Sequence, residues 1–204
     1  MKPIDLDHIL TTLGADAWSA NERSRARVAG GVAVIVYDGH TRDQGTPYIE
    51  HPLATVTLLR TEIGVSHPET LLLALLHDAL EVAPESEALL VQHLGGPFTT
   101  CLRAMTADHR LEQRPKAIGD ETRWRAKQAA LPPEDLLVRL ADRVHNLRDL
   151  AASPSPERRD RFMKSLADFH LPLAATVRRL SPHLNAMYGL LHAEYGRQQQ
   201  EVRP

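Results

Sequence analysis

Apolar residues recur at the spacing of α-helices along most of the chain, and no segment alternates convincingly as a half-exposed strand would. The segment 134–150, EDLLVRLADRVHNLRDL, has the clearest pattern. Four of its apolar residues share one stripe, namely Leu136, Leu140, Val144 and Leu147. The β-branched run 31–39 could form a strand, but it continues a helical segment, so we expect a helix there. The pattern predicts an all-α fold of roughly eight to ten helices.

Prolines and glycines indicate where several helices begin and end. Two His-Pro pairs, at 51–52 and 67–68, each place proline at the first helical position, where its missing N–H costs nothing. Gly64 is expected to end the first of these helices. The second is predicted to run unbroken to Pro84, and the polar segment 108–130 reads as a loop followed by a helix.

A Ser- and Pro-rich break at 153–157 separates the helix of 134–150 from the C-terminal part. Two more helices are predicted there, over 157–180 and 182–198. Neither a long linker nor a shift in composition divides the chain. We therefore expect one domain over 1–204, in which the C-terminal helices pack on a core formed by 37–150.

Composition narrows the class of protein. The 204 residues carry a formal net charge of −2, which gives no general argument for binding nucleic acid or an anionic membrane. No uncharged apolar run is long enough to span a bilayer. The single cysteine, Cys101, permits no internal disulfide and fits a reducing compartment. We expect a soluble cytoplasmic protein; the sequence leaves its oligomeric state open.

The stretch 74–84, ALLHDALEVAP, sets charged residues in an apolar helix. His77 and Asp78 are adjacent, and Glu81 follows one turn beyond the histidine. Leucine and alanine surround them, which is typical of a buried helix. Buried charges are costly unless they are paired, hydrogen-bonded or bound to a metal. These residues therefore either pair with groups elsewhere in the chain or form a site.

Two further segments supply the remaining members of such a site. Asp142 and Asn146 lie four residues apart and share a helix face close to the apolar stripe. Taken alone, Asp142 suits an ion pair with Arg139, and His51 suits a helix start or the surface. Together with His77 and Asp78 they make a set of two imidazoles and two carboxylates. Such a set suits manganese, iron or zinc.

Three motifs in order resemble the hydrolase domain of RelA/SpoT-type alarmone enzymes, and most of all the stand-alone small alarmone hydrolases of the HD superfamily. They are HTRDQGTPYIEHP (40–52), LLHDALE (75–81) and LVRLADRVHNLRDL (137–150). The resemblance covers residues 37–150. It implies an all-helical HD fold that holds one Mn²⁺ ion, although other divalent transition metals are also possible.

The resemblance also implies the role of each site residue. The metal ligands fall on His51, His77, Asp78 and Asp142, and the catalytic glutamate falls on Glu81. The arginine that packs on the purine falls on Arg42, and a nucleotide-contacting asparagine falls on Asn146. The implied reaction removes pyrophosphate from the ribose 3′ position of (p)ppGpp and leaves GDP or GTP.

Departures from the family pattern keep two alternatives open. Val82 stands where an acid usually follows the glutamate, and Asp43 stands where a basic residue usually follows the arginine. His40 and Tyr37 also replace the usual residues, so the first loop is expected to be altered on its substrate-facing side. One alternative is an HD phosphohydrolase for an adenosine alarmone or a nucleotide phosphomonoester. The other is a weakly active nucleotide-binding module.

The arginine-rich segment 109–128 is compatible with either a solvated helix face or contacts to substrate phosphates. The candidate residues for phosphate contacts are Arg114, Lys116, Arg123 and Lys127. Trp18 and Trp124 are expected to be packing residues. The sequence thus predicts a metal-dependent HD phosphohydrolase that acts on a small nucleotide.

Overall fold

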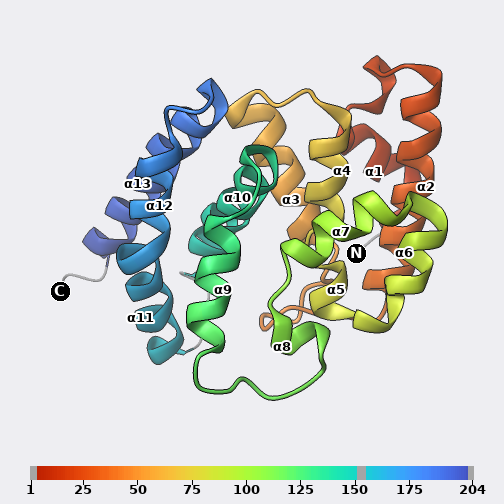
Figure 1. The fold of residues 1–204 in the computed structure, drawn as a ribbon. Coiled ribbons are helices and arrows are strands. Elements are labelled where there is room, and N and C mark those ends of the chain that lie inside the picture. The colour runs from red at the N-terminus through yellow and green to blue at the C-terminus, as the bar shows by residue number, and fades with distance from the viewer. Residues whose placement is uncertain (1–3, 151–154, 202–204) are drawn as a thin grey trace.

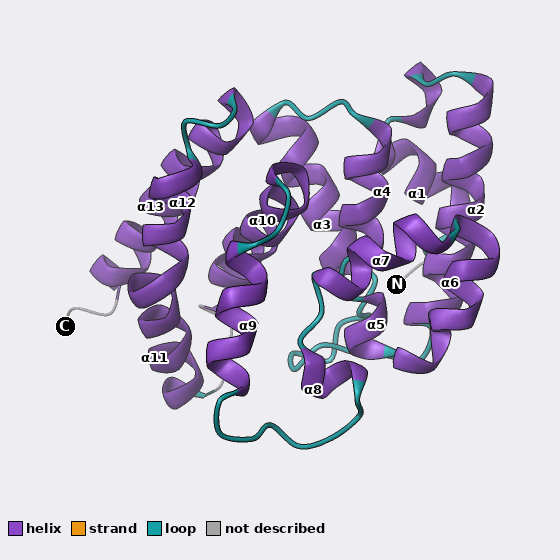
Figure 2. Cartoon of the chain, in the orientation of Figure 1, coloured by secondary structure: helices purple, strands orange, loops and turns teal. Residues whose placement is uncertain are grey.

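A computed structural model describes residues 4–150 and 155–201, and the regular structure in these ranges is helical (Figure 2). The only β-type pairing there is an isolated bridge between Thr41 and Pro47, in a loop. The predicted all-α fold is confirmed, and the ambiguous run 31–39 is helical as far as Tyr37. None of the described helices is long and apolar enough to cross a membrane.

The helices of the first half carry the first two motifs. In chain order they are α1 (Leu6–Leu13), α2 (Ala20–Tyr37), α3 (Glu50–Leu58), α4 (Pro68–Leu76), α5 (Ala79–Val82), α6 (Glu87–Leu94) and α7 (Gly96–Ala104). The helices of the second half are α8 (Asp108–Leu111), α9 (Asp120–Ala129), α10 (Pro133–Asp149), α11 (Pro156–Ser165), α12 (Leu171–Val177) and α13 (Pro182–Glu201).

Helix α10 lies in the middle of the fold (Figure 1). It packs against α3 and α4 on one side and against α13 on the other. Leucines and valines of α10 are buried on this stripe, as the periodicity predicted. Leu184, Met187 and Leu191 of α13 belong to the same cluster of buried apolar residues. The third motif is therefore at the centre of the packing, facing α3 and α4.

Local signals set several helix ends. The hydroxyl of Ser19 and the carboxylate of Glu22 form a reciprocal capping box at the start of α2. Pro68 is the first residue of α4, as predicted. Helix α3 begins at Glu50, before Pro52, and continues into a π-type turn that ends at Gly64. Gly64 has φ +80°, a left-handed conformation that glycine adopts without a steric cost.

Two predicted helices are interrupted. The helix expected over 67–84 is not continuous, because α4 ends at Leu76 and α5 begins at Ala79. The helix expected over 157–180 widens to a π-type turn at Leu166–His170 and resumes as α12. Pro172 lacks the N–H that a regular α-helix would donate one turn back, which accounts for the wider turn. The break predicted at 153–157 lies partly outside the described residues.

Candidate metal centre

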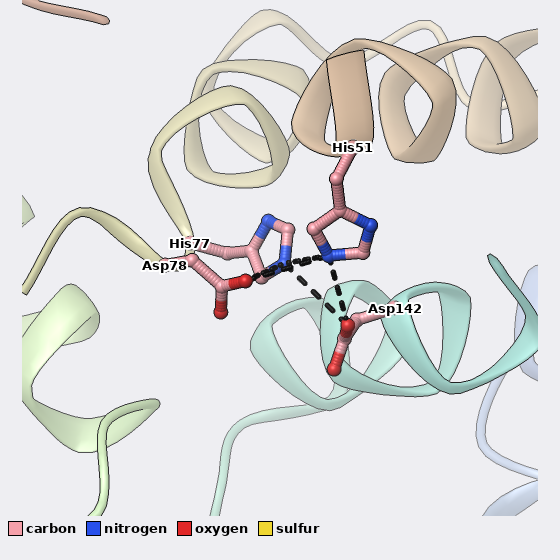
Figure 3. Close-up of side chains that lie close together, drawn as sticks. All are labelled: His51, His77, Asp78 and Asp142. Carbon is pink, nitrogen blue, oxygen red and sulfur yellow. Dashed lines mark hydrogen bonds and ion pairs between the residues drawn. The ribbon is translucent and has the colours of Figure 1, made fainter. Parts of the chain in front are cut away.

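Three separate helical segments bring His51, His77, Asp78 and Asp142 together. His51 comes from the first turn of α3, His77 and Asp78 from the junction of α4 and α5, and Asp142 from the middle of α10. One donor atom of each residue lies within 4.8 Å of the others, and all four side chains are buried. Figure 3 shows the two imidazoles and two carboxylates converging on one point.

The break between α4 and α5 explains how two adjacent residues join one site. Successive side chains of a regular α-helix diverge by about 100°. Asp78 has φ −101° and ψ 3°, outside the helical region, and this turns its carboxylate toward the imidazole of His77. The interruption that the periodicity failed to predict is therefore what allows His77 and Asp78 to face the same point.

The nitrogen and oxygen atoms of the cluster are close enough to share one cation. Nε2 of His51 lies 3.1 Å from Oδ1 of Asp142 and 3.4 Å from Oδ2 of Asp78. Nε2 of His77 lies 3.4 Å from the same oxygen of Asp78 and 3.2 Å from Nε2 of His51. Two imidazole N–H groups would repel each other at that separation. At least one of the two nitrogens therefore presents a lone pair to the centre.

Three members of the cluster also have hydrogen-bond partners that are not part of it. Nδ1 of His77 donates to the carbonyl of Ala74 at 2.8 Å, which leaves the lone pair of the neutral ring on Nε2. The hydroxyl of Tyr48 donates to Oδ2 of Asp78 at 2.9 Å. Nδ1 of His51 lies 2.8 Å from Nδ1 of His145. Such partners fix the orientation of metal ligands in proteins.

The electrostatics of the cluster favour a positive charge at its centre. Burial alone would lower the pKa of His77, but the carboxylates of Asp78 and Asp142 more than offset it and raise that pKa to about 10. Burial opposes ionisation of Asp142, yet Arg143 and Arg139 hold its pKa well below the ordinary value. Burial also opposes ionisation of Asp78, but His77 and His51 hold its pKa well below the ordinary value. Two buried carboxylates that favour the ionised form attract a cation.

The contacts of Arg139 are compatible with both interpretations of Asp142, as an ion-pair partner and as a metal ligand. The arginine is buried, with Nη2 3.3 Å from Oδ2 of Asp142 and Nη1 3.4 Å from Oδ1 of Asp78. Trp124 packs under the guanidinium, whose carbon is 5.4 Å from the ring centroid. Asp142 therefore makes the expected ion pair through one oxygen and faces the cluster with the other. Trp124, like the buried Trp18, is a packing residue as predicted.

A cavity of about 310 Å³ opens beside the cluster, within the size range of small-molecule sites. Asp78 and Asp142 line it, and so do Glu81, Arg42 and Asn146. The side chain of Glu81 is 33% exposed and reaches this space. Desolvation, followed by the neighbouring charge of Asp78, raises the pKa of Glu81. Five of the seven sequence-predicted site residues thus line one cavity, and the other two, His51 and His77, lie in the buried cluster beside it.

The charged side chains that line the cavity determine which ligand charges it can bind. Five carboxylates face four guanidinium groups, so the lining alone carries a net charge of −1. The arginines are Arg42, Arg110, Arg143 and Arg158. Arg42 forms a short ion pair with Asp149, and Arg143 forms one with Asp142. Arg158 forms a third with Asp43. Arg110 has only a longer contact, 3.7 Å to Oε1 of Glu81.

The structure shows the surroundings of the residues that depart from the family pattern. Asp43 forms an ion pair with Arg158 of α11, so its charge is compensated within the protein. Val82 is half-buried against the hydrophobic core and does not line the cavity. The expectation that Tyr37 alters the substrate-facing loop is wrong. Tyr37 lies at the end of α2, buried, with its ring stacked on Tyr48 at 5.6 Å.

The arginine-rich segment forms ion pairs on the protein's own carboxylates. Arg114 and Arg123 both bind Asp120, and none of the four candidate residues lines the cavity. Lys116 binds Glu121 and Lys127 binds Asp108. The contribution of this region to the cavity is instead Arg110 of α8, which sequence reasoning missed. It also missed Tyr48 and His145, although both stand inside the motifs, three residues before His51 and three residues after Asp142.

Comparison with known proteins identifies the family of the chain. Residues 29–177 match the HD domain family. Among curated proteins, the chain is 33% identical over 152 residues to the bifunctional (p)ppGpp synthase/hydrolase SpoT of Escherichia coli K12, covering 74% of this chain and 21% of that protein. It is 30% identical over 145 residues to the guanosine-3′,5′-bis(diphosphate) 3′-pyrophosphohydrolase of Haemophilus influenzae, covering 70% and 21%. The chain spans about a fifth of the length of these relatives.

A solved structure shares the fold. It is described as a metazoan ortholog of SpoT that hydrolyses ppGpp, and it superposes with a TM-score of 0.64. The sequence identity is 22%, and the match covers 88% of this chain and 96% of that one. The chain therefore belongs to the HD domain family.

Proposed function

We propose that this member of the HD domain family is a metal-dependent phosphohydrolase that removes pyrophosphate from the 3′ position of guanosine alarmones. The products from (p)ppGpp would be GDP or GTP and pyrophosphate. The observation that carries the proposal is the buried cluster of His51, His77, Asp78 and Asp142 beside a cavity lined by arginines and Glu81. The hydrolase activity named for the Haemophilus and metazoan proteins supports it.

The donor set fits a divalent transition metal, with Mn²⁺ as the ion we propose. Two imidazole nitrogens and two carboxylate oxygens converge on one point, and this mixture suits ions of borderline hardness. When bound, such an ion supplies a more acidic water and polarises a phosphoryl oxygen. It would also change the net charge of the cavity from −1 to +1, and a polyanionic nucleotide needs a positive site.

Glu81 is the general base in this proposal. It lies on the wall of the cavity beside Asp78, and its raised pKa brings it closer to neutral pH than an ordinary carboxylate. A general base works best when its pKa lies near the working pH. Glu81 would accept the proton of the attacking water, and the proton would leave with the pyrophosphate or through solvent.

Two arginines of the cavity are proposed to bind different parts of the substrate. Arg42 is held by Asn146 and Asp149 on the wall of the cavity, where its guanidinium would stack on a purine. Arg110 has no short ion pair among the described residues, so it is the guanidinium most available to a phosphate group. The planar fork of arginine pairs with phosphate oxygens in two hydrogen bonds. Arg110 would therefore bind the departing pyrophosphate.

Val82 is the observation that favours a second candidate, a related phosphohydrolase for another nucleotide. No acid follows Glu81, so the chain lacks the second carboxylate that the family pattern has directly after the glutamate. A nucleotide phosphomonoesterase would release orthophosphate, not pyrophosphate. We also propose that the protein is located in the cytoplasm, where such nucleotides are made.

A substrate screen separates these candidates. Protein loaded with Mn²⁺ is incubated in parallel with ppGpp, an adenosine 3′-pyrophosphate and nucleoside 3′-monophosphates, and the products are separated by ion exchange. Pyrophosphate release from ppGpp that fails in the Glu81→Gln variant supports the proposal. Turnover confined to the 3′-monophosphates supports the second candidate, and binding without turnover of any of them indicates a nucleotide-binding module.

A further inference from the structure

One histidine of the third motif has no part in the cluster or the cavity, yet it contacts a member of the cluster. His145 lies on α10, one turn beyond Asp142. Its Nδ1 is 2.8 Å from Nδ1 of His51, and the two ring centroids are 4.8 Å apart. The side chain of His145 is 17% exposed and that of His51 is fully buried. This contact is therefore shielded from water.

A hydrogen bond between two Nδ1 atoms contains one proton, so only two arrangements of neutral rings are possible. If His145 donates, His51 carries its own proton on Nε2, directed at the carboxylates. If His51 donates, its Nε2 has a lone pair. Only the second arrangement matches His77, whose Nδ1 donates to Ala74 and whose Nε2 is unprotonated in the neutral ring. Only this arrangement makes both Nε2 atoms available as ligands.

The local backbone explains why His51 needs a side-chain acceptor. His77 stands at the end of α4 and uses the carbonyl of Ala74, three residues earlier in the same helix. His51 stands in the first turn of α3, and the carbonyl three residues earlier, that of Tyr48, accepts the backbone N–H of His51. The acceptor for the ring of His51 is therefore supplied by a different helix, α10.

We infer that His145 is a positioning residue, whose Nδ1 accepts the Nδ1 proton of His51 and so holds the Nε2 lone pair of His51 toward Asp78 and Asp142. The inference rests on the metal centre of the proposed function. His145 touches neither substrate nor ion in this account. Because it shares α10 with Asp142, it also fixes the imidazole of α3 relative to the carboxylate of α10.

Three variants test this role. His145→Leu removes the acceptor and keeps an apolar side chain of similar bulk. His145→Asn offers a carbonyl oxygen close to the position of Nδ1. His93→Leu removes an exposed histidine of α6 as a control. Affinity for Zn²⁺ and for Mn²⁺ is measured by competition with a chelator, without any activity assay.

The expected result is an affinity about 10- to 100-fold weaker in His145→Leu, as for other partners that orient metal-binding histidines. His145→Asn should recover most of that loss, and His93→Leu should match the wild type. Nitrogen-15 NMR of the diamagnetic Zn²⁺ form should show His51 protonated at Nδ1 in the wild type. In His145→Leu this signal should broaden or shift.

The outcomes for the two claims can be told apart. A wild-type protein that binds neither ion contradicts the proposed function itself. A wild type that binds tightly, with His145→Leu equally tight, overturns only the role of His145. Equal weakening in His145→Leu and His145→Asn would show that ring shape matters and not the acceptor, which also overturns it. Should His145→Leu fail to fold, the Nδ1 proton of His51 in the wild type decides, and its absence there counts against the inference.

Discussion

Nη2 of Arg42 donates a hydrogen bond of 2.7 Å to Oδ1 of Asn146. The amide nitrogen of Asn146 in turn donates to Oδ1 of Asp142, the same oxygen that faces His51. The side chain expected to stack on the purine is thereby connected, through one amide, to the carboxylate of the metal centre. Under the proposed function, the position of the base relative to the bond that breaks would depend on this connection.

Replacing Asn146 tests that connection. In Asn146→Ala the guanidinium of Arg42 keeps only Asp149, and a hydrogen bond to a charged group is worth about 1.5–3 kcal/mol. We expect kcat/KM for ppGpp to fall roughly 10- to 100-fold, mainly through KM, with metal content unchanged. Steady-state kinetics and elemental analysis measure both. The exposed Asn185→Ala is the control, and an unchanged KM in Asn146→Ala would contradict the account.

Removing a ligand should abolish the thermal response to metal. A ligand that binds only the folded state stabilises it by about 2.7 kcal/mol at a concentration of 100 times Kd. We expect added Mn²⁺ to raise the Tm of the wild type and to leave His77→Ala and Asp142→Ala unchanged. Differential scanning calorimetry with and without EDTA provides the measurement. A Tm rise in these variants as large as in the wild type would rule out this site.

Val82 offers a test of the missing acid. Its side chain packs against the apolar core, so Val82→Asp buries part of a carboxylate without delivering it to the cavity. We expect the variant to lose about 1–3 kcal/mol of stability and to gain no turnover. Urea unfolding and a ppGpp assay check the two parts. Val91→Asp, at an exposed position of α6, serves as the control. Several-fold faster turnover would mean that position 82 reaches the reacting groups.

His170 should make the stability of the protein depend on pH. Burial, and then the charge of Arg143, lowers the pKa of its imidazole to about 3. Because this pKa lies below that of histidine in the unfolded chain, the neutral imidazole favours the native state. This contribution to stability is complete above about pH 6.5 and is lost as the pH falls. Between pH 7.5 and 5.0, His170→Phe should lose about 2 kcal/mol less than the wild type in urea unfolding. Equal losses would show that His170 does not titrate in this way.

The helices and the site residues could be predicted from the sequence for different reasons. Helix α10 follows from its stripe of leucines and valines, because amphipathic periodicity reports directly on burial. The convergence of His51, His77, Asp78 and Asp142 followed from the family resemblance, since spacing along the chain does not show which helices meet. The resemblance also placed Glu81, Arg42 and Asn146 at what proved to be one cavity.

What the sequence could not provide depends on backbone detail and on contacts between distant helices. The turn at Asp78 lies within an apolar run that periodicity extends unbroken to Pro84. The pairing of Asp43 with Arg158 joins residues more than a hundred positions apart, so the sequence did not show that the charge of Asp43 is compensated within the protein. The choice of Arg110 over its basic neighbours follows only from which carboxylates those neighbours bind.

The most direct test of the central claim is to follow the oxygen of water through the reaction. Metal-free protein is reloaded with Mn²⁺ and given ppGpp in water enriched in oxygen-18, and the products are separated and weighed by mass spectrometry. We expect GDP without the label and pyrophosphate carrying one labelled oxygen, with no reaction before reloading. Label found only in orthophosphate, or an active wild type whose rate is unchanged by removing the metal, would contradict it.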